Sequence, residues 1–321
     1  MKAIILGIFA SMFFAMSFIM NRAMELSGGN WIWSAALRYF FMLPFLVVLV
    51  VVRGNLKVLI IHMRQQLFQW IIWSTIGFGL FYAPLCFSAA YGPSWLVASM
   101  WQLTIITGTL LVPFFYKESE VNGQFIKYRQ KIPIKGLLFS AIILLGIAVI
   151  QIEQMNTLSL KELLFGIFPV VIAAFSYPLG NRKMMEVCNH QLDTFQRVLG
   201  MTIASMPFWI VLAIIGFARV GAPSVSQMSQ SIIVAVSSGV IATLLFFSAT
   251  DLAKGEVHKL AAIEATQAGE VIFALMGEIF ILKGVLPSGF SIVGMIIVII
   301  GMILHSFATN SRKEKKEIFF E

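Results

Sequence analysis

Long apolar stretches separated by short polar segments follow one another along the whole chain. Each stretch holds about 20 residues, the length that an α-helix needs to cross the hydrocarbon core of a bilayer. The pattern predicts ten transmembrane helices, at approximately 3–24, 31–52, 68–90, 94–115, 134–152, 161–181, 195–217, 230–250, 260–282 and 287–309. The first stretch is long for a signal peptide and lacks a small-residue cleavage site, so we expect it to be retained.

The lysines and arginines between these helices predict how the chain is oriented. Cytoplasmic segments of membrane proteins carry an excess of both residues. With a cytoplasmic N-terminus, the predicted outer loops contain only three of the 23 basic residues, namely Lys161, Arg219 and Lys283. The charge distribution therefore predicts that both termini are cytoplasmic, and its regular alternation supports the count of ten helices.

The sequence repeats itself at a spacing of 159 or 160 residues. The matching positions lie in three pairs of predicted helices: 7–9 with 166–168, 21–22 with 181–182, Arg38 with Arg197, and 87–89 with 247–249. A constant spacing predicts two duplicated halves of five helices each, residues 1–152 and 153–321. Because five is odd, the second half crosses the membrane in the opposite sense. Inverted repeats are the architecture of secondary transporters, which bind substrate near the bilayer midplane.

Composition narrows the classes of function. Hydrophobic residues make up 59% of the 321 residues and charged residues 12%, about half the charged share of soluble domains. Such a chain is insoluble as a globule, which excludes soluble enzymes, nucleic-acid-binding proteins and secreted disulfide scaffolds. The net charge of +8 comes from residues in short loops, so it indicates no nucleic-acid partner. Cys86 and Cys188 lie in or beside apolar stretches and suit neither a disulfide framework nor a zinc cluster.

Two short stretches resemble a known family. They are 264–278, which ends in Glu270-Val-Ile-Phe-Ala-Leu-Met-Gly-Glu278, and the run Trp101-Gln102-Leu103-Thr104. With the ten helices in two halves, they resemble the drug/metabolite transporter superfamily, and its multidrug-resistance efflux branch in particular. The resemblance implies a multi-pass protein of the plasma membrane, of the bacterial inner-membrane type, that exports small molecules.

The chain departs from that family in two places. Val271 occupies the position of the usual proline after the acidic residue of the ninth helix. The first predicted helix also lacks the membrane-embedded glutamate on which the small four-helix relatives base proton and drug exchange. A carboxylate that performs this exchange must therefore come from the ninth helix.

The ninth predicted helix carries several polar side chains into the membrane. Buried ionisable residues cost about 2.5–3.5 kcal/mol each on insertion scales, so each needs a partner or a function. On an ideal α-helix Glu264, Gln267, Glu270 and Glu278 share an arc about 120° wide, as expected where a helix lines a wet cavity. Glu270 lies nearest the bilayer centre. Because burial favours a neutral carboxyl group, we expect Glu270 to exchange a proton for a cationic substrate.

The two repeat-related arginines lie at opposite depths of the predicted bundle. We expect Arg38 to approach Glu278 near the outer surface, and Arg197 to approach Glu264 near the inner surface, as alternating ion pairs that gate the pathway. Structural roles are equally open, with the arginines bonded to carbonyl groups and the glutamates statically paired or partly solvated. The Asn-Arg pairs at 21–22 and 181–182 are expected to anchor helix ends at the interface.

A second group of candidate substrate-binding residues comprises Trp101, Gln102, Tyr82 and Tyr177. The two tyrosines lie close to prolines, and proline in a spanning helix frees a carbonyl group and permits a kink, often at a cavity. An aromatic ring at a kink can hold a flat or cationic ligand by stacking and cation–π contact. The alternative is that these rings only pack, or lie in the aromatic belt at the membrane surface.

These features together predict a secondary active transporter that exports small cationic or lipophilic compounds in exchange for protons by alternating access. A metabolite exporter or exchanger of the same fold is the alternative, because the two buried arginines suit a carboxylate or phosphate. A channel or scramblase would show flux that is insensitive to proton gradients. An enzyme or ATP-driven pump is not expected, since the sequence lacks a nucleophile set, a metal motif and a phosphate-binding glycine loop. We expect no cofactor, no metal and no nucleic acid, and a functional monomer, because one chain supplies both halves.

Overall fold

The computed structural model describes residues 2–121, 124–129, 132, 134–157, 160–189, 191–252, 263, 265–284 and 286–317. Nearly all of these residues are helical. Six helices in them are long and apolar enough to cross a membrane: Lys2–Leu26, Trp31–Val52, Leu67–Ser88, Leu164–Cys188, Thr194–Val220 and Val225–Phe246. Shorter apolar helices occupy Leu138–Ile150 and Gly289–His305. The expectation of a helical, multi-pass membrane protein is thereby confirmed, whereas the exact count of ten crossings stays a prediction.

The elements of the first predicted half follow the apolar pattern closely. They are α1 (Lys2–Leu26), α2 (Trp31–Val52), α3 (Leu56–Gln65), α4 (Leu67–Ser74), the π-helix η1 (Thr75–Gly79), α5 (Leu80–Ser88), α6 (Ser94–Trp101), α7 (Leu103–Leu110), the 3₁₀-helix η2 (Val112–Phe114), β1 (Tyr116–Val121), β2 (Gln124–Arg129) and α8 (Ile134–Thr157). Segments α4, η1 and α5 form one continuous span, in which η1 is a π-helical turn.

The second predicted half is helical throughout its described elements. Its elements are α9 (Leu160–Cys188), α10 (Thr194–Val220), α11 (Val225–Val234), the π-helix η3 (Ala235–Ile241), α12 (Ala242–Asp251), the 3₁₀-helix η4 (Thr266–Ala268), α14 (Gly269–Phe280) and α15 (Gly289–Glu317). The predicted start of the ninth span, including Glu264, lies outside the described residues.

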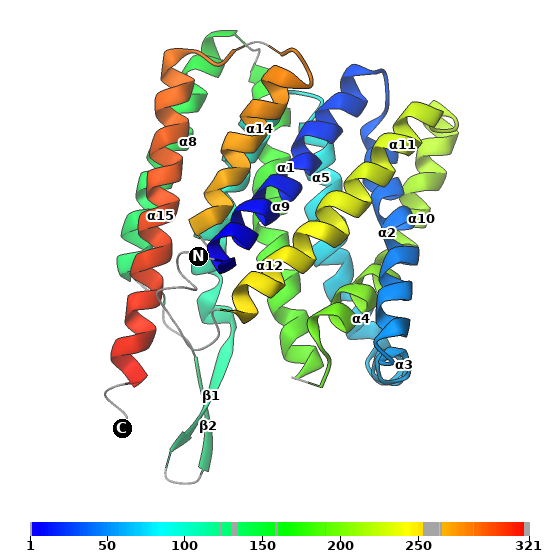
Figure 1. The fold of residues 1–321 in the computed structure, drawn as a ribbon, viewed down its shortest axis with the longest axis vertical. Helices are drawn as coiled ribbons and strands as arrows, with labels where there is room; N and C mark the ends of the chain where they lie inside the picture. The colour runs from blue at the N-terminus through cyan, green and yellow to red at the C-terminus, as the bar shows by residue number, and fades with distance from the viewer. Residues whose placement is uncertain are drawn as a thin grey trace.

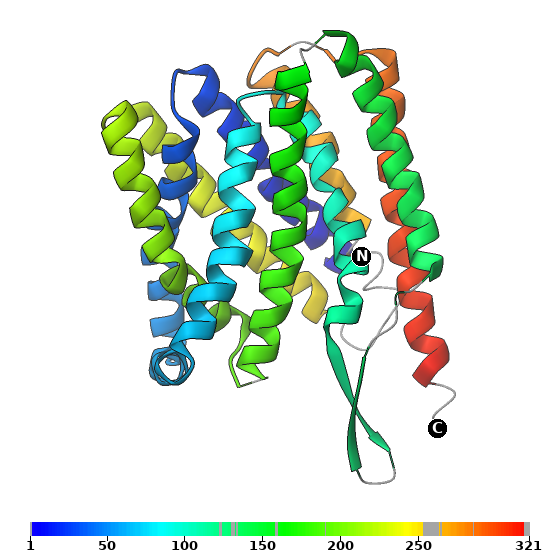
Figure 2. The ribbon, with the colours of Figure 1, turned by 180° about the vertical axis from the view of Figure 1, so that it is seen from behind.

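Figures 1 and 2 show the long helical segments running alternately up and down through one bundle. The pair α8 and α15 lies side by side at one edge in both views, and α2, α10 and α11 lie at the opposite edge. The hairpin of β1 and β2 extends beyond the helices at the end where the chain's C-terminus also lies. We call this end of the bundle the hairpin end.

Three local features differ from the pattern of uninterrupted spans. The stretch predicted as one helix at 94–115 is divided at Gln102 into α6 and α7. Helix α3 occupies a predicted loop, and β1 and β2 pair antiparallel from Tyr116↔Arg129 to Val121↔Gln124. Asn-Gly at 122–123, between two strand-forming runs, is the hairpin signal that a search for long apolar stretches overlooks.

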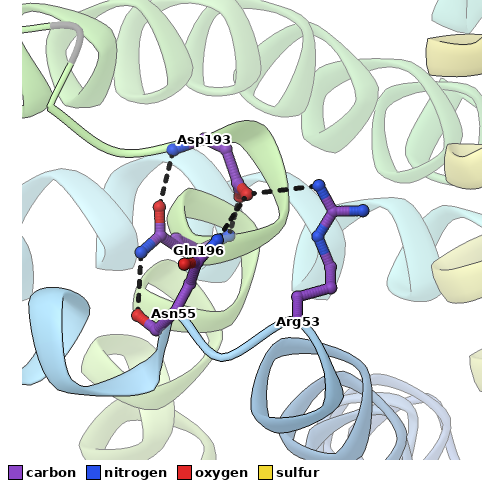
Figure 3. A network of polar contacts seen from close by, with 4 residues as sticks. All are labelled: Arg53, Asn55, Asp193 and Gln196. Carbon is purple, nitrogen blue, oxygen red and sulfur yellow. Dashed lines mark hydrogen bonds and ion pairs between the residues drawn. The ribbon is translucent and has the colours of Figure 1, made fainter.

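Polar groups in the loops tie α2 to the second half at the hairpin end (Figure 3). Asp193 and Gln196 form a capping box at the start of α10, which satisfies backbone N–H groups of its first turn. The same aspartate lies 3.5 Å from Nη2 of Arg53, and Nε2 of Gln196 donates to the backbone carbonyl of Asn55 at 2.8 Å. The exposed ion pair itself contributes about 0–1 kcal/mol.

The opposite end of α2 is tied to the second half as well. The indole N–H of Trp33 donates to the carbonyl of Gly221 at 2.9 Å. Nε2 of Gln227 donates to the carbonyl of Asn30 at 2.7 Å and lies 3.0 Å from the hydroxyl of Ser34. Helix α2 is therefore held against α10 at both of its ends, and against α11 at the end that begins with Trp31.

The π-helical segments pack against helices of the other half through small residues. Gly77 in η1 faces Gly180 in α9, so that the two backbones approach each other directly. A Cβ atom at Gly180 would overlap the backbone of Gly77 and would lie 2.8 Å from the carbonyl oxygen of Trp73. Close backbone approach at small residues is a usual way for helices to associate in membranes, where dispersion contacts replace the hydrophobic effect.

This packing predicts the effect of adding one methyl group. Gly180→Ala should destabilise the protein by about 1–3 kcal/mol, because the added Cβ forces α9 and η1 apart. The matched control is Gly289→Ala at the start of α15, where an added Cβ meets nothing within 4 Å. Thermal unfolding of both purified variants in detergent measures the difference. Equal midpoints for the two variants would contradict the close packing.

Candidate functional site

Two helices of the bundle are interrupted, and Gln102 and Glu270 lie at the interruptions. Gln102 joins α6 to α7, and its N–H donates to the carbonyl of Ser99 at 3.2 Å, a three-residue spacing typical of a 3₁₀ turn. Glu270 lies in the first turn of α14, directly after the 3₁₀ turn η4. Interrupted helices in corresponding positions of two halves are the features that line substrate sites in transporters.

The carboxyl group of Glu270 is buried, with 6% of the residue exposed. Its side chain lies near that of Gln102, whose Nε2 donates to the carbonyl of Ala98 at 3.0 Å. Within the described part of the chain, Glu270 forms no ion pair. Gln267, one turn earlier, has a buried Nε2 without a hydrogen-bond partner among the same residues.

The 3₁₀ turn η4 changes the expected arrangement of these polar groups. A 3₁₀-helix has 3.0 residues per turn in place of 3.6, so the arc calculated for an ideal α-helix does not extend from Gln267 into α14. Glu270 and Glu278 are both buried, as expected, whereas Gln267 is half-buried.

Three aromatic rings form a cluster beside Gln102. The ring of Trp101 lies 5.0 Å from that of Phe81 and 5.5 Å from that of Tyr177, and the last two are 4.8 Å apart between centroids. Trp101 and Phe81 are half-buried, and 37% of Tyr177 is exposed. The structure therefore brings the candidates Trp101 and Tyr177 together and adds Phe81. Nothing in the sequence distinguishes Phe81 among the 29 phenylalanines.

The proline beside Tyr177 does not break its helix. Pro178 lacks an N–H group, so the carbonyl of Ala174 loses its partner in α9. The hydroxyl of Thr107 in α7 donates to this carbonyl. The helix continues from Leu160 to Cys188, and the proline creates a polar contact between α7 and α9.

Tyr82 belongs to a different group of side chains, around Arg38. Tyr82 is fully buried, and its hydroxyl exchanges hydrogen bonds with the amide of Asn21 at 3.1 and 3.2 Å. The guanidinium carbon of Arg38 lies 4.1 Å from the centre of the Tyr82 ring. Asn21 was expected to anchor a helix end, but it is buried here, and Arg22 fills that role by donating to the carbonyl of Ala89 at 3.0 Å.

Arg38 and Glu278, which were expected to pair, have other partners. Glu278 is 3% exposed and accepts hydrogen bonds from the N–H of Ser94 at 2.8 Å and from its hydroxyl at 2.6 Å. Its carboxylate thus caps the first turn of α6, where backbone N–H groups lack partners within the helix. Ser94 directly follows a proline, Pro93, at the start of this helix. A proline directly before serine indicates in the sequence that a helix begins there. It does not indicate that Glu278 accepts the hydrogen bonds of Ser94.

Only one member of the second expected ion pair lies among the described residues. Arg197 lies half-buried in the first turn of α10, and Glu264 is outside the described residues. The other repeat-related residues, Asn181 and Arg182, were expected to end a helix, but α9 continues about two turns further, to Cys188. Asn181 donates to the carbonyl of Tyr177 at 2.9 Å, and Arg182 donates to that of Gly108 at 2.6 Å.

Comparisons with solved structures support the fold. A structure titled "Crystal structure of protein" superposes on 94% of this chain and 95% of its own chain, with a TM-score of 0.60. At 13% identity the likeness concerns the fold alone.

Comparisons of sequence identify relatives and a family. A protein of Bacillus subtilis (strain 168), titled "Uncharacterized protein YjlA", is 57% identical over 317 residues, which is 99% of this chain and 98% of the relative. A protein of Shouchella clausii, titled "Uncharacterized 42.1 kDa protein in intracellular alkaline protease 3'region", is 49% identical over 84% of this chain and 70% of its own length. Residues 1–311 match the family EmrE, described as "Putative multidrug resistance efflux transporter". The chain therefore belongs to the EmrE family of multidrug resistance efflux transporters, within the drug/metabolite transporter superfamily.

Proposed function

We propose that this protein is a secondary active transporter that exports small cationic, zwitterionic or lipophilic compounds in exchange for protons. The observation that carries the proposal is Glu270, a buried carboxyl group at a helix interruption with no ion pair in the described residues. A carboxyl group removed from water is neutral unless a cation accompanies its charge. A proton and a cationic substrate therefore compete for Glu270, and this competition is the requirement for exchange.

The surroundings of Glu270 suit a cation with a flat or apolar body. The rings of Phe81, Trp101 and Tyr177 contact one another, and Trp101 directly precedes Gln102, whose side chain lies near the carboxyl group. Aromatic faces attract cations, including quaternary ammonium groups, and also stack on flat rings. We assign the cationic group of the substrate to Glu270 and its apolar body to this aromatic cluster, with Gln267 as a further hydrogen-bond donor.

Alternating access requires two halves that can change places, and the two π-helices support the proposed duplication. Residues 75–79 of η1 and 235–239 of η3 are related by the same 160-residue spacing as the sequence repeat. Segment η1 packs against α9, and η3 packs against α1, so each contacts the first helix of the other half. π-Helical turns often occur at functional sites, and we propose that both segments act as hinges between the halves 1–152 and 153–321.

We propose an inverted arrangement of ten crossings, both termini on the cytoplasmic side, and one chain as the transporting unit. This orientation is the one that the distribution of lysine and arginine favours. The proposed inner pair of Arg197 and Glu264 would gate the cytoplasmic side. We assign Glu278 a different role. Its contacts with Ser94 favour a carboxylate that positions α6, and not one that moves as a gate.

The test of proton coupling is uptake by the purified protein in liposomes. A pH gradient should drive accumulation of a fluorescent lipophilic cation in wild type, and Glu270→Gln should reduce it to the level of protein-free liposomes. Glutamine keeps the size and hydrogen bonding of the side chain but exchanges no proton. Glu186→Gln, a substitution of an exposed glutamate that pairs with Lys183 on α9, is the matched control and should transport normally. Gradient-driven accumulation by Glu270→Gln would move the coupling to another carboxylate.

The role of Glu278 gives a prediction of stability. Glu278→Ala leaves the N–H of Ser94 without its partner in a buried position, which costs about 1–3 kcal/mol and lowers the midpoint of thermal unfolding. Glu278→Gln retains an accepting oxygen, so most of the stability and the transport rate should remain. If Glu278→Gln unfolds like wild type but transports nothing, the carboxylate acts in the cycle and the capping role is insufficient.

A further inference from the structure

Arg38 carries a buried positive charge that no carboxylate neutralises in the part of the chain that the structure describes. The residue is 8% exposed, and its closest contacts are the hydroxyl of Ser17, 3.2 Å from Nη1, and the ring of Tyr82. The ion pairs of the described chain do not include it. Ionisable residues within spanning segments usually pair with another group, and those that do not are candidates for contact with substrate.

The hydrogen bonds of Arg38 lead to neutral groups. Ser17 accepts from Arg38 and donates to the hydroxyl of Ser238 at 2.7 Å, which in turn donates to the carbonyl of Val234 at 3.0 Å. Nε of Arg38 is buried and has no hydrogen-bond partner in the described chain. Nε belongs to the edge of the guanidinium group that can hold a carboxylate by two parallel hydrogen bonds.

Arg182 and Arg22, which are half-buried, do not share this situation. Arg182 donates to the carbonyl of Gly108 at 2.6 Å. Arg22 also has an unpartnered Nε, but it donates to the carbonyl of Ala89, and Glu25 lies one turn further along α1. Carbonyl groups at helix ends carry partial negative charge and thus offset these two cations. Among the described residues, the contacts of Arg38 include no comparable carbonyl group.

Arg38 also lies where the two proposed halves meet. Its contacts Ser17 and Tyr82 belong to α1 and α5, and Ser238 belongs to the π-helix η3 of the second half. Tyr82 directly follows Phe81, and the two rings are 5.7 Å apart. Of these two neighbouring residues of α5, Tyr82 therefore contacts Arg38, and Phe81 belongs to the aromatic cluster with Trp101 and Tyr177.

We propose that Arg38 binds a carboxylate of the transported compound, and that the substrate is a zwitterion with a flat apolar spacer between its two charges. The carboxylate pairs with Arg38, the spacer packs on Phe81, Trp101 and Tyr177, and the cationic group reaches Glu270. This inference rests on the proposed function and narrows its substrate class. The order of the three contacts follows the order in which the side chains adjoin one another. Arg38 lies over Tyr82, the Tyr82 ring adjoins Phe81, and Phe81 adjoins Trp101.

A matched pair of probes tests the inference in proteoliposomes with a pH gradient. Benzyltrimethylammonium and its 4-carboxy derivative differ only in the carboxylate, and their fixed charge prevents passage as a neutral amine. Wild type should take up the zwitterion with a kcat/KM about tenfold or more above that of the cation. Arg38→Gln should lower kcat/KM for the zwitterion about tenfold to a hundredfold, the range expected for a hydrogen bond to a charged group, and leave the cation unaffected.

Arg38→Lys keeps the charge without the forked geometry, and provides a second variant if Arg38→Gln does not fold. Its preference for the zwitterion over the cation should be smaller than that of wild type but should not be lost completely. An equal decrease for both probes in either variant would mean that Arg38 only stabilises the fold, and would overturn the inference. Uptake of the cation without preference for the zwitterion in wild type would also overturn it, while the proposed function stands. If wild type accumulates neither probe, the proposed function fails and this inference fails with it.

Discussion

The absence of water in a bilayer makes every buried polar group of this protein depend on a partner within the fold. Backbone and side-chain groups that lack a hydrogen bond cost several kcal/mol in hydrocarbon, so the helices are joined wherever such a group would be left over. Thr107 satisfies the carbonyl that Pro178 leaves without a partner in α9, and Glu278 satisfies the N–H and hydroxyl groups of Ser94 at the start of α6. These contacts connect helices far apart in the sequence and thereby define the bundle.

Glu270 and Arg38 are two buried ionisable residues without an ion-pair partner in the described chain. Their charges have opposite signs, yet each is surrounded by amide, hydroxyl and aromatic groups in place of an ion-pair partner. A stable fold does not need such groups, because apolar residues of similar size would pack without the cost of burying a charge. Transport offers a reason for them, since protons and charged substrates can supply the missing partners in turn.

The interruptions of the helices have a related explanation. At Gln102 and before Glu270 the helices tighten to 3₁₀ turns, and at η1 and η3 they widen to π turns. Each change alters which carbonyl and N–H groups are paired, and it shifts the phase of the side chains that follow. The first kind of change lies at Gln102 and directly before Glu270. The second kind lies where η1 packs against α9 and η3 packs against α1.

Hydropathy in the sequence was sufficient to predict a helical membrane protein, because burial of a 20-residue apolar stretch in lipid depends on composition alone. It also made Glu270, Gln102, Trp101 and Tyr177 candidates for the site, since polar and aromatic residues are conspicuous within apolar helices. The hairpin at 116–129 was missed because its signal, an Asn-Gly turn, is local and lies outside any apolar stretch. The partner of each buried charge depended on packing: only the tertiary structure joined Glu278 to Ser94 and placed Arg38 over Tyr82. Such contacts join residues that are as many as 184 positions apart in the chain, and helix periodicity relates only neighbours within a few turns.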